Sequence, residues 1–268
     1  MSLKLLQTFL ASKQNIFVLT GAGVSAESGI PTYRDHQGKW LRNDPIQHLE
    51  FLEQKAKRQR YWTRSMVGWK HVQAAKPNGT HMGLARWESM EKISLLVTQN
   101  VDGLHQRAGS RNVLDLHGRL SEVVCLDCDT RSSRADLQPR LEAENPDLAN
   151  FAAACLPDGD ADIDDFDIDN VAIPECSTCG GMLKPDVVFF GGAVPKPAIE
   201  KAFDALSRSD AVLVIGSSLT VFSGFRFCRK AAETGIPIAC INQGKTRADE
   251  LFSVKVEMAA SDAISQMS

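Results

Sequence analysis

The sequence lacks any apolar run that approaches the roughly 20 residues that a helix needs to cross a bilayer. Its first residues contain neither the apolar segment nor the small-residue cleavage site of a signal peptide, and they do not form the long Arg- and Ser-rich stretch of a transit peptide. An excess of positive charge is also lacking, because 30 basic and 33 acidic residues give a net charge of −3. We therefore expect a cytoplasmic monomer that binds neither membranes nor nucleic acid directly.

The cysteines do not form the even set of a disulfide scaffold. Seven are present, and four of them form the pairs Cys125-x-x-Cys128 and Cys176-x-x-Cys179. Without a signal peptide, this pattern favours reduced thiols that hold a metal. Each pair can place two thiolates at the ~2.3 Å Zn–S distance, so the sequence predicts one tetrahedral, structural Zn²⁺ per chain. A redox pair and a nucleic-acid-binding zinc ribbon are the alternatives.

Short apolar runs alternate with helical stretches, which is typical of an α/β fold. Because each run is nearly continuous in apolar residues, the runs predict strands buried on both faces of a Rossmann-like parallel sheet. Each run ends in glycine or small polar residues, and ligands of such sheets bind beyond the carboxyl ends of the strands. The runs lie at 16–19, 93–97, 187–190, 211–215 and 236–241.

Two segments interrupt this pattern and predict a smaller inserted domain. Residues 36–80 are rich in helical pattern, and residues 119–183 are loop-rich and contain both cysteine pairs. Within the second segment, residues 156–175 carry eight acidic and no basic side chains, which is typical of a solvated loop. A Ca²⁺ site is the alternative, but no spacing there fits an EF-hand. The remaining residues, 1–35, 81–118 and 184–268, are expected to form the nucleotide-binding domain.

The end of the first run carries a glycine-rich motif. Residues 21–26, Gly-Ala-Gly-Val-Ser-Ala, match the pattern G-x-G-x-x-G/A, in which glycines allow a tight turn and a close approach to a pyrophosphate at a helix N-terminus. The acidic ribose ligand that usually follows is in doubt, because no strand precedes Asp44. Asn242, directly after a predicted strand, is the better candidate for binding a ribose.

Histidine is suited to base catalysis near neutral pH, and His117 is the candidate for that role in this sequence. His117 ends a short apolar stretch just before the second insertion. A lone histidine is more often structural, and His81 and His105 are expected to be so because they fall in helical patterns.

Taken together, six segments and the two cysteine pairs resemble the signature motifs of the sirtuins, which are NAD-dependent protein-lysine deacylases. The motifs follow the family order over about residues 10–245. Details at 58–62 and 156–160 resemble the class II, mitochondrial lipoamidase-like branch. The resemblance implies a Rossmann-like large domain, a zinc-bearing small domain and a cleft between them. The six segments are 21–34, 98–105, 116–118, 184–191, 216–219 and 241–242.

The resemblance also implies a reaction that consumes NAD as a co-substrate. The acyl-lysine carbonyl oxygen would attack the ribose C1′ as nicotinamide leaves, and His117 would be the general base for the ribose hydroxyl that attacks next. Asn100 and Asp102 would complete the catalytic set by orienting the nicotinamide ribose and the carboxamide. Mono-ADP-ribosyl transfer to protein and an NAD-sensing binding module are the alternative functions.

Position by position, the resemblance assigns further residues to the two substrates. Val188, Phe189, Phe190 and Gly191 would pair with an acyl-lysine peptide as an added strand. The implied NAD contacts are Gly21, Ala22, Gly23, Ser25, Glu27, Ile30, Pro31, Tyr33, Arg34, Gln99, Asn100, Val101, Asp102, Gly216, Ser217, Ser218, Asn242, Gln243, Gly244 and Ala260.

The pair Tyr61-x-x-Arg64 bears on the choice of acyl group. At helical spacing the two side chains lie on one face, and in some sirtuins a Tyr/Arg pair of this form binds an acidic acyl group. Arginine offers a bidentate fork for a carboxylate. The alternative is a surface arginine on a solvated, basic helix.

Overall fold

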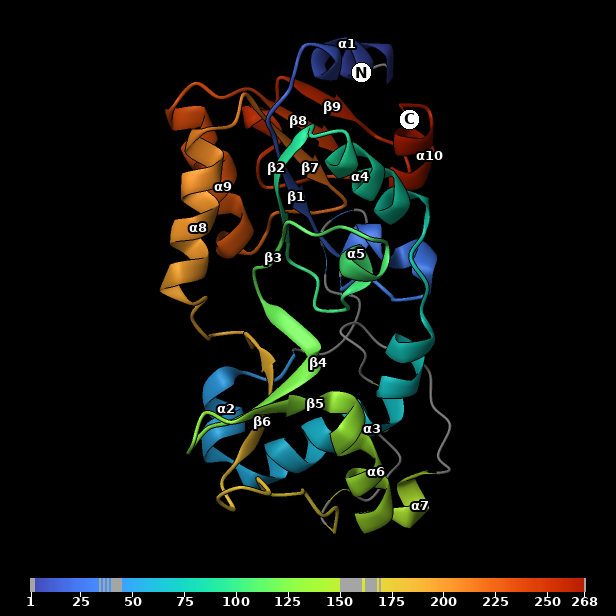
Figure 1. The fold of residues 1–268 in the computed structure, drawn as a ribbon, viewed down its shortest axis with the longest axis vertical. Helices are drawn as coiled ribbons and strands as arrows, with labels where there is room; N and C mark the ends of the chain where they lie inside the picture. The colour runs from blue at the N-terminus through green and yellow to red at the C-terminus, as the bar shows by residue number, and fades with distance from the viewer. Residues whose placement is uncertain are drawn as a thin grey trace.

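The computed structural model describes residues 3–33, 35, 37, 39, 45–149, 161, 168 and 170–267. Within these residues, the chain forms a six-stranded sheet and a three-stranded sheet. The six-stranded sheet and its helices occupy one end of the molecule, and the three-stranded sheet lies at the other end with α2, α3, α6 and α7 (Figure 1). Both ends of the chain lie beside the larger sheet (Figure 1).

The larger sheet is parallel throughout and has the order β3-β2-β1-β7-β8-β9. Every residue of its central strands β1, β7 and β8 is buried, as expected for strands covered on both faces. When the strands of this sheet are numbered by their sequence order within the sheet, the spatial order is 3-2-1-4-5-6, which is that of a Rossmann fold. This confirms the predicted fold class. The strands are β1 (Ile16–Thr20), β2 (Ile93–Thr98), β3 (Val113–Asp115), β7 (Ala211–Ile215), β8 (Ile238–Ile241) and β9 (Val254–Val256).

Helices cover both faces of this sheet through two separate apolar clusters. One cluster includes Leu6, Leu84 and Ile264 and lies under α1, α4 and α10, and the other includes Leu206 and Phe227 and lies under α8 and α9. Among the described residues, none of the helices combines the length and the apolar character that a membrane span requires. The helices are α1 (Leu3–Ala11), α4 (Gly79–Ser89), α8 (Lys196–Ser207), α9 (Phe222–Glu233) and α10 (Ala260–Ser265).

The smaller sheet is antiparallel, with the order β5-β4-β6. Its helices bury a third cluster that includes Phe51, Trp62, Val123 and Leu141. This sheet and its helices are built from two parts of the chain that are far apart in sequence. The elements are α2 (His48–Glu53), α3 (Lys55–Ala74), β4 (Gly118–Cys125), β5 (Arg131–Ser133), α6 (Arg134–Glu144), α7 (Pro146–Ala149) and β6 (Leu183–Val187), and the short helix α5 (Leu104–Arg107) follows β2 of the larger sheet.

The prediction that residues 187–190 form a strand of the parallel sheet is wrong. β6 ends at Val187 and pairs with β4 in the smaller sheet, and Phe190 forms an isolated bridge with Gln47. The apolar residues of this run are buried for another reason, because the Phe189 ring packs 5.1 Å from the rings of Phe51 and Tyr61. The run therefore joins the two sheets instead of extending the larger one.

Candidate active site

A cleft of about 990 Å³ lies at the carboxyl ends of β1, β2, β7 and β8, and this volume is at the upper end of the range for ligand pockets. Residues of the smaller lobe, including Tyr61, Leu120 and Val187, form its opposite wall. The strand order of the large sheet reverses between β1 and β7. Ligands of open α/β sheets bind beyond the strand ends at such a reversal, so the fold itself places a ligand site here.

Most of the predicted site residues line this cleft. Of those that the structure describes, all the predicted catalytic, NAD-contacting and substrate-contacting residues do so except Gly244 and Arg64. Arg34 and most of the acidic segment 156–175 lie outside the described residues. The structure therefore gathers one site from segments that are separated by more than two hundred positions in the sequence.

Two glycines bring the loops after β1 and β7 together at the centre of the cleft. A Cβ atom on Gly23 would lie 2.9 Å from the Gly216 backbone, and one on Gly216, which has φ +59°, would lie 2.6 Å from the nitrogen of Val24. Alanine at either position would push the loops apart. The helix N-terminus that the glycine motif predicts is absent here, because two 3₁₀ turns, η1 (Ala22–Val24) and η2 (Ala26–Ser28), follow the first glycine.

A chain of hydrogen bonds connects Asp102, Ser25 and Asn100. The Ser25 hydroxyl donates to Asp102 Oδ2 at 2.6 Å, and Asn100 Nδ2 donates to Ser25 Oγ at 3.0 Å and to the Gly21 carbonyl at 3.1 Å. Burial raises the pKa of the Asp102 carboxyl, although hydrogen bonds from Ser25 and Leu104 oppose this. These contacts fix the amide and the carboxyl against the glycine loop, where they can orient a ribose and a carboxamide.

His117 lies on the same wall, between β3 and β4. Its Nδ1 lies 2.9 Å from the Gln99 carbonyl and its Nε2 lies 2.8 Å from Ser223 Oγ. A carbonyl only accepts, so Nδ1 carries a proton, and in the neutral ring the lone pair is on Nε2. Burial lowers the pKa of His117, although the bond to Gln99 opposes this. The imidazole is therefore neutral near pH 7 and is able to accept a proton.

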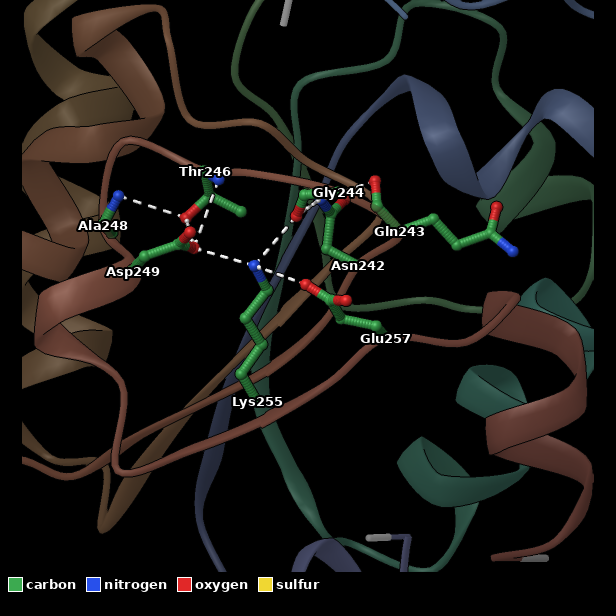
Figure 2. Close-up of polar contacts among 8 residues, drawn as sticks. All are labelled: Asn242, Gln243, Gly244, Thr246, Ala248, Asp249, Lys255 and Glu257. Atoms are coloured by element: carbon green, nitrogen blue, oxygen red, sulfur yellow. Dashed lines mark hydrogen bonds and ion pairs between the residues drawn. The ribbon is translucent and has the colours of Figure 1, made fainter. Parts of the chain in front are cut away.

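The loop after β8 forms the far end of the cleft, and Asn242 and Gln243 line it. Lys255, on β9, supports this loop on the side away from the cleft. Its Nζ donates to the Gly244 carbonyl at 2.8 Å and lies 3.0 Å from Asp249 Oδ1. Figure 2 shows the Lys255 amine at the centre of this cluster, beside Glu257 as well. Burial opposes the charge of Lys255, but hydrogen bonds to the two carboxylates outweigh it and raise its pKa.

The predicted peptide-binding segment, residues 188–191, is held to the protein along one edge. The Val188 N–H donates to the His117 carbonyl at 2.8 Å, and the Phe190 carbonyl accepts from the His48 N–H at 2.8 Å. Of the predicted acyl-binding pair, Tyr61 is buried and lines the cleft, whereas the partly buried Arg64 is not among the lining residues. The structure therefore places one member of this pair at the site.

Four cysteines meet at one end of the smaller sheet, as the spacing predicts. Cys125, Cys128, Cys176 and Cys179 place their Sγ atoms within 4.8 Å of one another, with 3.5 Å and 3.8 Å for two of the pairs. Sulfur atoms bound at ~2.3 Å around a tetrahedral ion are about 3.8 Å apart. The donor set therefore fits Zn²⁺, and four thiolates leave no position open for a reacting water.

Sequence comparison decides the family. The pattern of the Sir2 family matches residues 21–223, which include the glycine motif, His117 and all four clustered cysteines. The chain belongs to the Sir2 family. This confirms, at the level of the family, the resemblance seen in the sequence motifs.

Individual relatives agree with this sirtuin assignment over the whole chain. An NAD-dependent protein deacetylase of Xanthomonas campestris pv. campestris (strain 8004) is 53% identical over 97% of this chain and 88% of the relative. The NAD-dependent protein deacylase Sirt4 of Drosophila melanogaster is 45% identical over 99% of this chain and 86% of the relative. A solved Sir2 structure with a deacetylated p53 peptide and 3′-O-acetyl-ADP-ribose has a TM-score of 0.78 at 27% identity, covering 99% and 97% of the two chains.

Two other histidines of the sirtuin core lie behind the glycine loop. His81 and His105 are buried with ring centroids 4.7 Å apart, and His105 Nε2 lies 3.0 Å from the Thr20 hydroxyl. Burial lowers the pKa of His81 to about 4, and burial together with the charge of His81 lowers that of His105 to about 3. Both are neutral at physiological pH, in line with the structural role expected of them.

Sequence reasoning missed several polar residues of this site. Ser223, Arg226 and Lys245 line the cleft, and Lys255 supports its floor, but none was singled out. Ser223 could have been noticed, because it lies at the start of a helix directly after the Gly216–Leu219 motif. Lys255 could not, because a single lysine in a three-residue strand gives no pattern.

Proposed function

We infer that this sirtuin is an NAD-dependent protein deacetylase, which moves an acyl group from a protein lysine to ADP-ribose and releases nicotinamide. The single observation that carries this proposal is the neutral imidazole of His117, which lies in one cleft with the glycine loops and the Asn100–Asp102 pair. The relatives named deacetylases or deacylases, and the solved structure that contains acetyl-ADP-ribose beside a deacetylated peptide, support it.

The roles of the residues follow from their positions. NAD, when bound, supplies a glycosidic bond that breaks as the acyl oxygen of the substrate attacks the ribose. Asn100 and Asp102 hold the ribose and the carboxamide, and the glycine loops at Gly23 and Gly216 make room for the diphosphate. His117 Nε2 then accepts the proton of a ribose hydroxyl, because Nδ1 is already protonated and Nε2 is the ring nitrogen that carries the lone pair.

The protein substrate binds, in this proposal, as an extended acyl-lysine peptide beside residues 188–191. One edge of this segment is bonded to His117 and His48, and its side chains line the cleft. Addition of a strand relies on backbone bonds and tolerates many sequences. We therefore propose that the recognised feature is the acyl-lysine itself and that no single sequence is required around it.

The smaller lobe has a structural role in this proposal. Zn²⁺ bound by the four cysteines would hold the end of β4 and the turn before β6, so that Tyr61 and Leu120 keep their positions in the cleft. We propose the division expected above, with residues 36–80 and 119–183 forming the smaller domain, extended by the rest of β6 up to Val187, which pairs with β4. Reduced thiols are needed for this metal, which favours a cytoplasmic location.

Acyl-peptide assays with mass spectrometry test the proposal. Removing a general base typically costs 10²- to 10⁴-fold, so His117→Ala should lose deacylation by about that factor and keep NAD binding. His71→Ala, which alters an exposed histidine of α3, is the matched control. Unchanged turnover of His117→Ala would refute the role of His117. A protein made heavier by ADP-ribose, with the peptide still acylated, would instead show mono-ADP-ribosyl transfer.

The finer placement within the family is also proposed here. We place the chain in the class II branch, and the 45% identity to the Drosophila Sirt4 deacylase supports this. We retain the prediction that Tyr61 and Arg64 favour acidic acyl groups, since Tyr61 lines the cleft and Arg64 follows it by one helical turn. Arg64→Met should then reduce activity on glutaryl- or succinyl-lysine far more than on acetyl-lysine, whereas Arg86→Met, an exposed arginine of α4, should affect neither. Equal losses on both substrates would reject this specificity.

A further inference from the structure

His117 has a second partner that the reaction outlined above does not use. Its Nε2, the nitrogen that must accept a proton, lies 2.8 Å from the hydroxyl of Ser223. The two residues are 106 positions apart in the sequence, so this contact exists only because the fold brings the start of α9 beside the turn between β3 and β4. Both nitrogens of the imidazole are therefore held, by the Gln99 carbonyl on one side and by Ser223 on the other.

The hydrogen positions follow from the chemistry of these partners. Because the Gln99 carbonyl accepts the proton of Nδ1, the neutral ring has no proton on Nε2, and the Ser223 hydroxyl must donate to it. A hydroxyl also accepts hydrogen bonds. When Nε2 has gained a proton, the same oxygen can accept from it without moving. Ser223 is thus able to hold the ring in both protonation states that a general base passes through.

Ser223 and the next residue, Gly224, show that the start of α9 packs closely against the Gln99 side chain at this part of the cleft. Ser223 is 8% exposed, and a Cβ atom on Gly224 would lie 2.5 Å from Oε1 of Gln99. The Gln99 amide that occupies this space donates to Ser217 Oγ at 2.8 Å and to the Thr20 carbonyl at 3.2 Å. Ser223 therefore holds His117, and Gly224 leaves the space that the Gln99 side chain occupies. The carbonyl of Gln99 in turn sets the tautomer of His117.

We propose that Ser223 is a positioning residue for the general base, holding the His117 ring in place at the wall of the cleft, which both residues line. The proposal rests on the proposed function of His117. The Ser223 hydroxyl releases the single lone pair of Nε2 when the ribose hydroxyl passes its proton there, and the serine oxygen then accepts from the Nε2–H. Since release of nicotinamide precedes this proton transfer, Ser223 should matter for the second stage of the reaction and not for the first.

Three variants test this by separating the two stages. Exchange of labelled nicotinamide into NAD in the presence of an acyl peptide reports on the first stage, and formation of the acylated ADP-ribose reports on both. Ser223→Ala should lower kcat for product formation about tenfold, the fold-change that one ordinary hydrogen bond represents, while exchange and the KM for NAD stay near the wild-type values. Ser223→Thr, which keeps a hydroxyl, should be more active than Ser223→Ala.

Ser94→Ala is the matched control, because it removes a serine hydroxyl that is hydrogen-bonded to Ser209 at the far end of the sheet. Product formation by Ser223→Ala at the rate of this control would overturn the proposal, and so would an equal loss of exchange and of product. A threonine variant no more active than the alanine variant would also overturn it. If His117→Ala itself retains deacylation, the proposed function has failed instead.

Discussion

The two sheets of the molecule keep their shape by different means. In the larger sheet, β1, β7 and β8 are buried along their whole length between two apolar clusters. In the smaller sheet, β5 is exposed at every residue, and one end of the sheet is held by the four-cysteine cluster. The larger sheet is stabilised mainly by burial, whereas the smaller one combines an apolar cluster of its own with the ligand set of a metal.

This difference matches what each part contributes to the cleft. The larger sheet supplies Asn100, Asp102 and the glycine loops, whose chemistry needs positions fixed by a rigid scaffold. The smaller lobe supplies Tyr61, Leu120 and Val187, mostly apolar contacts that shape the opposite wall. We expect that damage to the smaller lobe abolishes catalysis while leaving the nucleotide-binding sheet folded.

Removal of the metal ligands should have the largest effect. Cys125→Ser or Cys176→Ser should abolish zinc binding and unfold the smaller lobe, because structural zinc contributes roughly 10–16 kcal/mol of binding free energy that is also folding free energy. Deacylation should be lost, and hydrogen exchange should accelerate in β4 and β6 but not in β1 and β7. The zinc content of the purified variant measures the loss of the metal, and hydrogen exchange followed by mass spectrometry measures the unfolding of the smaller lobe.

The control for these variants is a cysteine of the other sheet. Cys240 is fully buried in β8 and lies apart from the four-cysteine cluster. Cys240→Ala should lower stability modestly, through lost packing, and keep a full equivalent of zinc. If Cys125→Ser instead unfolds both sheets in one step, the two parts fold as one unit, and the two sheets are not stabilised independently.

Acid should weaken the larger lobe through its buried histidine pair. The pKa values of His81 and His105 fall from the ordinary 6.5 to about 4 and about 3 in the folded protein, so below pH 6.5 the unfolded chain binds more protons. The free energy of unfolding should therefore decrease as pH falls from 6.5 towards 5, by up to about 1.4 kcal/mol per pH unit for each histidine. Denaturant unfolding followed across this range measures the slope.

A single substitution separates this effect from general acid denaturation. His81 is the third residue of α4, and its Nδ1 lies 3.2 Å from the backbone N–H of the N-cap residue Asn78. Glutamine is a usual residue at this position of a capping box, so His81→Gln keeps the cap and removes the titration. The slope should become smaller by the contribution of one histidine, while His105 and His117, whose pKa values are also lowered, continue to contribute. An unchanged slope would assign the acid sensitivity to other groups.

Local spacing was enough to predict much of this architecture, and contacts between distant segments account for what was missed. The cysteine pairs and the glycine motif were found because each depends on residues a few positions apart. Residues 187–190 were misassigned because an apolar run shows burial but not which sheet receives it. The bond between His117 and Ser223 spans 106 positions, and no local pattern predicts a contact of that kind.

The smallest effect is expected for a change at Lys255, at the edge of the larger sheet. Here a charged side chain, and not apolar burial, supports the loop that lines the cleft. Lys255 is 15% exposed and joins the Gly244 carbonyl to the carboxylates of Asp249 and Glu257 (Figure 2). Lys255→Met should leave two acidic groups facing each other and loosen the loop that carries Asn242. One or two hydrogen bonds at about 1 kcal/mol each would raise the KM for NAD roughly five- to thirtyfold.

Because Lys255 lies below the loop and does not line the cleft, kcat at saturating NAD should change less than twofold. Lys201→Met, on the exposed face of α8, provides the control for loss of one positive charge. A fall in kcat with an unchanged KM would mean that Lys255 acts on the reacting groups and not on the nucleotide loop. A raised KM alone would show that even the apolar, rigid sheet depends on one ion cluster where it meets its ligand.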